Sequence, residues 1–237
     1  MDAATLDFRT YAATAATHSH AFHQVVLPWR GRLEIEIDGR GGRVDRDCAA
    51  VIGAGARHAF EARGANRFVV ADLAADGEDG ALLARLGERR YVTLPPALRR
   101  LLATLADVAP ADAAARRAFV RVLLHAMDGT RTDAAVDALA AWLRAAPPAA
   151  APDAATLARL AGLSRAQFYR RFGARAGQAP GALRRAQRLA RACTLLRDGD
   201  APIADIALAC GYAEQSALTR ALRRHCGLTP GQVRARR

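Results

Sequence analysis

The sequence predicts an α+β protein of two domains. The first is a small N-terminal β-barrel with flanking helices, and the second is an all-α domain in which a long helix joins two helix-turn-helix units. Short alternating runs in the first part predict the strands. A helix–glycine–helix pattern occurs twice in the second part. Residues 152–237 also hold 16 of the 35 basic residues but only 5 of the 23 acidic ones, a charge asymmetry suited to a polyanionic partner.

The strands are expected within residues 1–95. Leu33, Ile35 and Ile37 alternate with charged residues, which predicts a strand with one buried face. Turn residues such as Asp38-Gly39 separate the runs. Short strands at this spacing favour a small barrel or sandwich. The expected strands cover residues 21–28, 33–37, 48–52, 58–61 and 67–73, whereas the first 20 residues carry little signal.

Amphipathic helices are expected in residues 96–146. Leu98, Leu101 and Leu102 follow Pro95-Pro96 at helical spacing, and similar spacings recur twice further along. These helices are suited either to cap the barrel or to form the seam of a homodimer. The Pro/Ala-rich residues 147–152 predict a linker before a C-terminal domain of residues 153–237.

The pattern of helix, glycine turn and helix is clearest in residues 201–237. Ile203 and Ile206 place one helix before Gly211. A second helix follows, with Leu218 and Leu222 on its apolar side and glutamine, threonine and arginine on the other. This pattern is typical of a helix-turn-helix unit. An ordinary helical hairpin with a solvated basic face is the alternative.

The same pattern occurs about 50 residues earlier, in residues 156–181. Gly162 corresponds to Gly211, and Ser164 with Gln167 predicts a capping box at the start of the second helix. In the later copy Ala213 stands at the cap position, so that cap is lost or shifted to a neighbour. Residues 181–196 between the copies predict one rigid helix about 24 Å long.

The segments GLSRAQFYRRF, IADIALACGY and GLTPGQVR, in this order and spacing, resemble the AraC/XylS regulators. The resemblance covers residues 153–237 and implies a sequence-specific DNA-binding transcription regulator, with double-stranded DNA as partner and RNA polymerase as a second partner if the protein activates. Matching the family's positions gives base contacts and phosphate contacts. The base contacts would be Ala166, Tyr169, Arg170, Gln215 and Arg220, and the phosphate contacts Arg165, Thr219, Arg223 and Arg224.

The segments HSHAFHQVVLPWRG, GARHAF and RFVVADL resemble the cupin-like barrel of many AraC regulators. This implies a regulatory domain that responds to a small-molecule effector. Cupin enzymes hold a metal with a His-x-His pair, a nearby Glu and a later His. Here His18, His20 and His58 are the candidate ligands, but Gln24 replaces the carboxylate, and a neutral amide is a poorer ligand. We therefore expect no metal, no cofactor and no enzymatic activity.

Two alternatives stay open from the sequence. One is a metal-dependent cupin enzyme fused to a DNA-binding domain, and the other is a DNA-binding protein without an effector. The basic residues are spread over several helices with no strongly apolar, aromatic face, which disfavours binding to a membrane surface. The N-terminus resembles no secretory signal and no apolar run reaches membrane-spanning length, so a cytoplasmic protein is expected.

Overall fold

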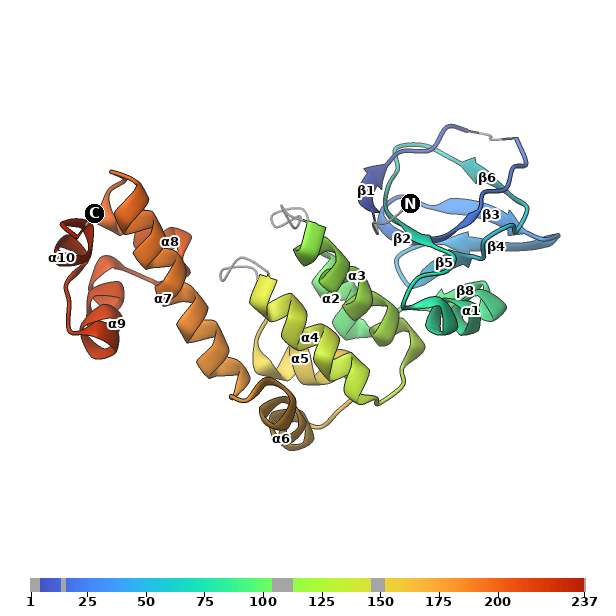
Figure 1. Cartoon of the computed structure of the whole chain (residues 1–237). Helices are drawn as coiled ribbons and strands as arrows, with labels where there is room; N and C mark the ends of the chain where they lie inside the picture. The colour runs from blue at the N-terminus through green and yellow to red at the C-terminus, as the bar shows by residue number, and fades with distance from the viewer. Residues whose placement is uncertain (1–4, 14–15, 104–112, 146–151, 237) are drawn as a thin grey trace.

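The computed structural model describes residues 5–13, 16–103, 113–145 and 152–236. Two β-sheets lie at one end of the molecule, a group of helices lies in the middle, and a small helical lobe lies at the far end of the long helix α7 (Pro180–Asp198) (Figure 1). The predicted linker, residues 147–152, falls outside the described residues except for Pro152.

The larger sheet has five antiparallel strands in the order β1-β7-β2-β5-β8, and the smaller has three in the order β4-β3-β6. Strand β2 is central in the larger sheet, where Val25 lies opposite Ala71 of β7 and Val51 of β5. In the larger sheet the strands are β1 (Thr5–Arg9), β2 (Phe22–Arg30), β5 (Cys48–Ile52), β7 (Arg67–Ala74) and β8 (Tyr91–Thr93). In the smaller sheet they are β3 (Leu33–Ile37), β4 (Arg40–Val44) and β6 (His58–Ala62).

The closed barrel expected from the sequence is not found, because the described strands form two separate sheets. In a closed barrel, backbone hydrogen bonds would connect the two sheets; here the side chain of Tyr91 connects them instead. The ring of Tyr91, from β8, covers Gly42 of β4. The Tyr91 hydroxyl lies 2.8 Å from the carbonyl oxygens of both Ile35 and Arg40 and can donate to either.

Strands β3 and β5 form at the residues expected, but strands β1, β4 and β8 were missed, as were the helices Gly80–Arg89 and Pro230–Arg234. Strand β4 has the sequence RGGRV, whose glycines predicted a turn, yet it pairs along its length with β3. Strand β1 lies at an edge and shows no clear alternation, and β8 has only three residues. Such segments become strands because a neighbouring strand accepts their hydrogen bonds, which local sequence does not reveal.

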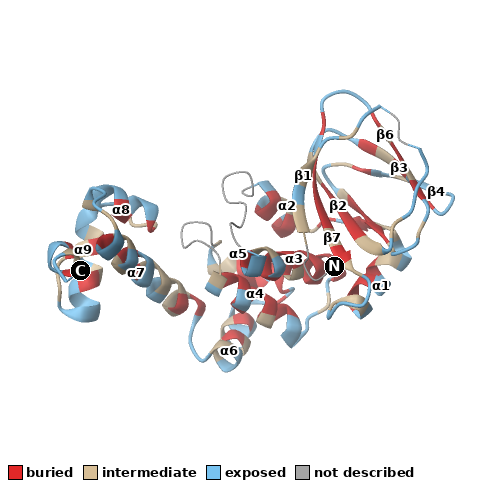
Figure 2. Cartoon of the chain, turned by 45° about the horizontal axis from the view of Figure 1, so that its top comes forward, coloured by how far each residue is buried: buried red, intermediate tan, exposed pale blue. Residues whose placement is uncertain are grey.

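The two faces of the larger sheet contribute to different apolar cores. Val26, Phe68 and Val70 face the smaller sheet and pack with residues such as Ile35 and Phe60. The opposite face packs against the helices, and buried positions continue from the strands into α3 and α4 (Figure 2). The helices of this middle part are α1 (Gly80–Arg89), α2 (Pro96–Ala103), α3 (Ala113–Asp128) and α4 (Asp133–Ala145).

The apolar core of the middle helices continues into the first helix-turn-helix unit. Phe168 and Phe172 belong to the same buried cluster as Phe119 and Trp142. A second, separate cluster, containing Leu196, Leu218 and Leu222, builds the distal lobe. The remaining helices are α5 (Ala154–Leu160), α6 (Arg165–Ala176), α8 (Ile203–Ala209), α9 (Gln215–Cys226) and α10 (Pro230–Arg234).

The contact between Gly42 and Tyr91 predicts a strong effect of a single methyl group. A Cβ atom at Gly42 would overlap the Tyr91 ring. The ring cannot easily move away, because its hydroxyl lies within hydrogen-bond distance of the Ile35 and Arg40 carbonyl oxygens. We expect Gly42→Ala to lower the free energy of unfolding by about 1–3 kcal/mol, as is usual for overpacking. Urea denaturation of the full chain measures the change.

Gly41→Ala is the matched control, because a Cβ at the preceding position meets no atom within 4 Å. It should leave stability within about 0.5 kcal/mol of the parent. Equal stability of the two variants would show that Tyr91 does not pack against β4.

Candidate nucleic-acid interface

The first helix-turn-helix unit is α5 and α6, and hydrogen bonds from side chains fix both of its helix starts. Asp153 caps α5 by accepting the Thr156 backbone N–H at 2.7 Å. Gly162 makes the turn with a φ of +65°, which favours glycine. At the start of α6, Ser164 Oγ accepts the Gln167 N–H at 3.3 Å, and Gln167 Oε1 accepts the Ser164 N–H at 3.1 Å. This reciprocal pair is a capping box.

Helix α6 has one buried and one exposed side. Phe168 and Phe172 are fully buried. Arg165, Ala166 and Arg170 are exposed, so three of the residues expected to contact DNA lie on the open side. Tyr169 is half-buried and packs against the core, with the Arg165 guanidinium 5.7 Å from its ring centroid. Its hydroxyl is therefore less free to move than the Arg170 side chain.

Two further arginines of α6 bind α4 and the residue Arg131 just before it. Arg171 Nη1 donates to the Arg131 carbonyl oxygen at 3.1 Å and lies 3.5 Å from the Asp133 carboxylate. Arg175 makes a bidentate salt bridge with Asp137, in which Nε donates to Oδ1 at 2.8 Å and Nη2 donates to Oδ2. These pairs hold the back of α6 against the middle helices. A signal was present only as acidic residues spaced four apart in α4, facing arginines spaced four apart in α6.

The second unit is α8 and α9, and it is capped differently. Gly211 makes the turn with a φ of +76°. The cap is shifted by one residue from Ala213 to Glu214, whose side chain makes no capping hydrogen bond. A capping box does form one helix later, where Thr229 and Gln232 bond reciprocally at the start of α10.

Helix α9 repeats the two-sided arrangement of α6. Leu218 and Leu222 are fully buried, and Thr219 is half-buried with its hydroxyl donating to the Gln215 carbonyl oxygen. Arg220 is held on its own helix, with Nη1 3.1 Å from Ser216 Oγ and Nη2 3.6 Å from the Glu214 carboxylate. The exposed side chains on the outer side of α9 include Gln215, Arg220, Arg223 and Arg224.

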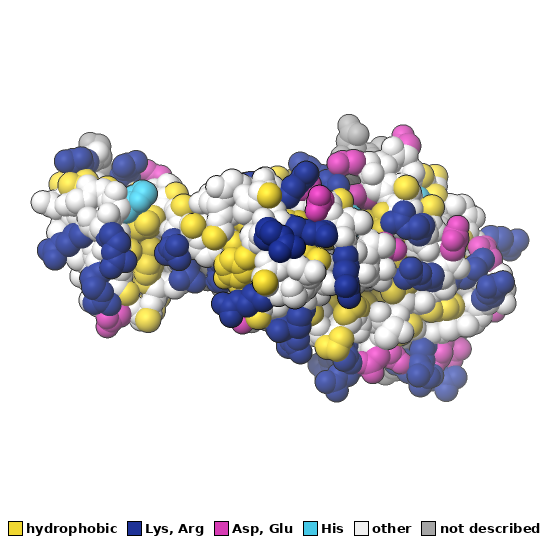
Figure 3. Space-filling view, turned by 90° about the horizontal axis from the view of Figure 1, so that it is seen from below, with side chains coloured by type: hydrophobic (Ala, Val, Ile, Leu, Met, Phe, Trp, Pro, Cys, Tyr) yellow, Lys and Arg dark blue, Asp and Glu magenta, His cyan; other side chains and the backbone are white. Residues whose placement is uncertain are grey.

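Helix α7 connects the two units and sets their separation. Its 19 residues span about 28 Å. Helices α6 and α9 lie near its opposite ends (Figure 1). Seen from below, arginine side chains are spread along the whole face, from the distal lobe to the end with the sheets, where acidic side chains lie among them (Figure 3). Helices α6 and α9 thus each carry exposed arginines, near opposite ends of α7.

The three histidines considered as metal ligands lie together at the rim between the sheets. The rings of His18 and His58 have centroids 4.2 Å apart, and those of His20 and His58 are 4.8 Å apart. Each Nδ1 lies within hydrogen-bond distance of a backbone carbonyl oxygen. Gln24 is engaged elsewhere, since its Nε2 donates to Asp72 at 2.8 Å. Among the described residues, no group of three or more His, Cys, Asp and Glu side chains is arranged to hold a metal ion.

The two helix pairs, each with a glycine turn and an exposed second helix, define a helix-turn-helix domain. A protein-family model described as a helix-turn-helix domain matches residues 157–236. An "AraC-like transcription regulator" of Streptomyces antibioticus is 39% identical over 87 residues, which cover 37% of this chain and 29% of that protein. A relative of the same description from Streptomyces lividans matches to the same extent. The C-terminal third of the chain thus matches a helix-turn-helix domain, and its sequence is similar to part of these AraC-like regulators.

Among solved structures, the chain is similar to the DNA-binding domain of AdpA, crystallised with a target DNA. The two are 33% identical with a TM-score of 0.40, over 43% of this chain and 90% of that one. The chain spans less than a third of the length of the curated relatives it matches. The cupin-like character expected of residues 1–95 stays a prediction. None of the helices in the described ranges has both the length and the apolar character needed to cross a bilayer.

The histidine cluster predicts a dependence of stability on pH. Burial lowers the pKa of His58, and the neighbouring His18 and His20 lower it further, while its hydrogen bond to Ala56 acts in the opposite direction. An unfolded histidine titrates near pH 6.5. Below that pH the unfolded chain therefore binds more protons than the folded one, and stability falls until the pH passes the lower folded pKa.

Replacing His58 with Gln should flatten this loss, by at most about 1.4 kcal/mol per pH unit. Urea unfolding between pH 7.5 and about pH 5 measures the slope. Burial lowers the pKa of His23 and His125 as well, so part of the slope should remain. His225→Gln, at an exposed position, is the control. An unchanged slope in His58→Gln would contradict the assignment.

Proposed function

We propose that the chain is a sequence-specific, DNA-binding regulator of transcription that places α6 and α9 in successive segments of the major groove. The observation that carries this proposal is the pairing of two exposed cationic helices at opposite ends of α7, each with a buried apolar side. Reading helices of this kind dock with base-contacting residues near their N-terminal ends, and sites one helical turn apart are separated by about 34 Å. The length of α7 is close to that spacing.

The exposed residues of α6 and α9 supply the contacts to bases. Arg170 and Arg220 have the guanidinium geometry that pairs with guanine, and Gln215 suits adenine. Ala166 can only touch a thymine methyl group, and Tyr169 adds a hydroxyl from a half-buried position. Arg220 must first leave Glu214 and Ser216, which costs part of the energy that its contact to DNA returns.

Other side chains are better suited to phosphates. Arg165 precedes the base-contacting positions of α6, and Thr219, Arg223 and Arg224 flank those of α9. Phosphate contacts fix the register of the protein on the duplex without specifying sequence. The arginine-rich C-terminal region supports a large electrostatic contribution to binding.

Response to a small molecule through the N-terminal part is the second element of the proposal. Its support is the apolar cluster that α3 and α4 share with α5 and α6, through which a change in the regulatory part would reach the first reading helix. The other proposed partners are a second copy of the chain, bound through the middle helices, and RNA polymerase if the protein is an activator. In this proposal the protein acts as a regulator and not as an enzyme.

The charge distribution predicts binding that weakens steeply with salt. The affinity of the full chain for duplex DNA should fall roughly a thousandfold or more between about 50 and 200 mM salt, if about six or more phosphates are contacted. Fluorescence anisotropy at several salt concentrations measures the slope. Affinity independent of salt would contradict an electrostatic interface.

The two-helix interface predicts separate losses of base preference. Arg170→Ala and Arg220→Ala should each weaken binding by about 1–3 kcal/mol and relax selection at their own bases only. The two sets of bases should lie about 10 base pairs apart. Selection of binding sites from random DNA with each variant measures the positions.

Arg223→Ala is the matched control, since it removes the same side chain from a position assigned to a phosphate. It should weaken all sequences about equally and reduce the salt slope by about one. If Arg170→Ala and Arg220→Ala relaxed the same bases, the proposal that α6 and α9 contact successive groove segments would be wrong.

A further inference from the structure

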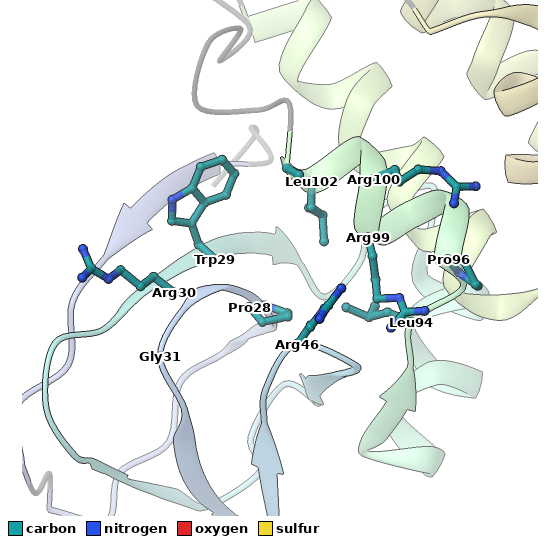
Figure 4. Close-up of a pocket in the computed structure, with 11 residues that line it drawn as sticks. Pro28, Trp29, Arg30, Gly31, Arg46, Leu94, Pro96, Arg99, Arg100 and Leu102 are labelled. Atoms are coloured by element: carbon teal, nitrogen blue, oxygen red, sulfur yellow. The ribbon is translucent and has the colours of Figure 1, made fainter.

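A cavity lies outside the sandwich, between the end of β2 and helix α2. Its volume is about 700 Å³, within the range of small-molecule sites. Its walls come from the end of β2, the β2–β3 and β4–β5 turns and α2, which the fold brings together from distant parts of the sequence (Figure 4). Apolar side chains form much of the lining, among them Pro28, Trp29, Leu94 and Leu102.

The polar part of the lining is entirely cationic. Four arginines and no acidic residue line the cavity. The side chains of Arg46 and Arg99 point toward one another across it, whereas Arg30 and Arg100 point away at its rim (Figure 4). Arg99 pairs with Asp47 through Nη1 only. A guanidinium has five N–H donors, so donors of Arg99 remain available beside that pair.

The guanidinium of Arg46 has no hydrogen-bonding or ion-pair partner in the part of the chain that the structure describes. It faces the guanidinium of Arg99 across the cavity. Two facing cations repel each other unless an anion lies between them. A carboxylate can accept hydrogen bonds from both, with the strength of charge-assisted contacts. Trp29 and the aliphatic side chains would bury an apolar body attached to that carboxylate.

We propose that this cavity binds a small organic carboxylate with an apolar body, and that this carboxylate is the effector of the regulator. The proposal rests on the proposed function and names the class of its ligand. Arg46 and Arg99 bind the carboxylate, and Trp29, Leu94 and Leu102 surround the apolar part.

Helix α2 gives the cavity a direct route to the first helix-turn-helix unit. Arg99 and Leu102 line the cavity, while Leu98 on the same helix is buried in the cluster that contains Leu157 and Phe168. Helix α2 packs against α3 and against α5. A ligand that draws Arg99 toward Arg46 therefore acts on a helix that supports α5, and it favours one placement of the reading helix over another.

The first arm of the test measures binding of two probe carboxylates, benzoate and octanoate, to the full chain by calorimetry, with neutral benzamide as the uncharged analogue of benzoate. We expect at least one carboxylate to bind and benzamide to bind at least about tenfold more weakly. Arg46→Gln should weaken carboxylate binding on the order of tenfold to a hundredfold, the range for a lost charged hydrogen bond. Arg57→Gln, at an exposed position outside the cavity, should leave it unchanged.

The second arm measures DNA affinity with and without the bound carboxylate, at matched ionic strength. Saturation should change the affinity at least about fivefold in the parent chain and in Arg57→Gln, but not in Arg46→Gln. Binding of neither probe, or equal binding by Arg46→Gln, would overturn the carboxylate site. Carboxylate binding without a change in DNA affinity would overturn its role as effector. Failure to bind DNA both with and without a carboxylate would instead reject the proposed function, so the two failures are distinct.

Discussion

The burial of α6 against α4 is the constraint on which the rest of the arrangement depends. Phe168 and Phe172 lie in one apolar cluster with Trp142 and Leu143, and Arg175 is paired with Asp137 beside it. A fully buried aromatic side chain stabilises a core by several kcal/mol, far more than the exposed ion pair adds. The apolar contact therefore supplies the energy, while the arginine–aspartate pairs fix which way α6 faces.

The distal lobe depends on a different core. Its buried residues, such as Leu196 and Leu222, share no member with the cluster that holds α6. Helix α7 belongs to both, since Leu183 packs in the first cluster and Leu189 in the second. The distance between α6 and α9 is therefore set by the length of one helix, and their relative orientation by how each end of that helix packs.

Arginines on these helices fall into different physical roles despite their similar sequence context. Arg171 and Arg175 are paired with Asp133 and Asp137 of α4, so their charges stabilise the contact between the two helices. Arg220 is held by Glu214 and Ser216, whereas Arg170 lies on the open side. A count of basic residues thus overstates the charge that faces DNA, because part of it stabilises the protein itself.

The sequence by itself determined the elements that local patterns specify. Apolar spacing located most of the helices and the strands β3 and β5. The repeated pattern around Gly162 and Gly211 located both helix-turn-helix units, because a turn with positive φ favours glycine wherever it occurs. The outward sides of α6 and α9 followed from the same spacing, whereas the candidate DNA contacts on them came from the resemblance to the AraC/XylS regulators and stay predictions.

Only the tertiary structure decided how these elements meet. The pairing of the glycine-rich β4 with β3, the position of Tyr91 between the sheets, and the cavity between β2 and α2 all join residues far apart in the chain. The seam between α6 and α4 does the same, because Arg175 and Asp137 are 38 residues apart. Contacts of this kind depend on which surfaces become buried together. The local pattern of residues along the chain does not specify those surfaces, because they form only when the chain folds.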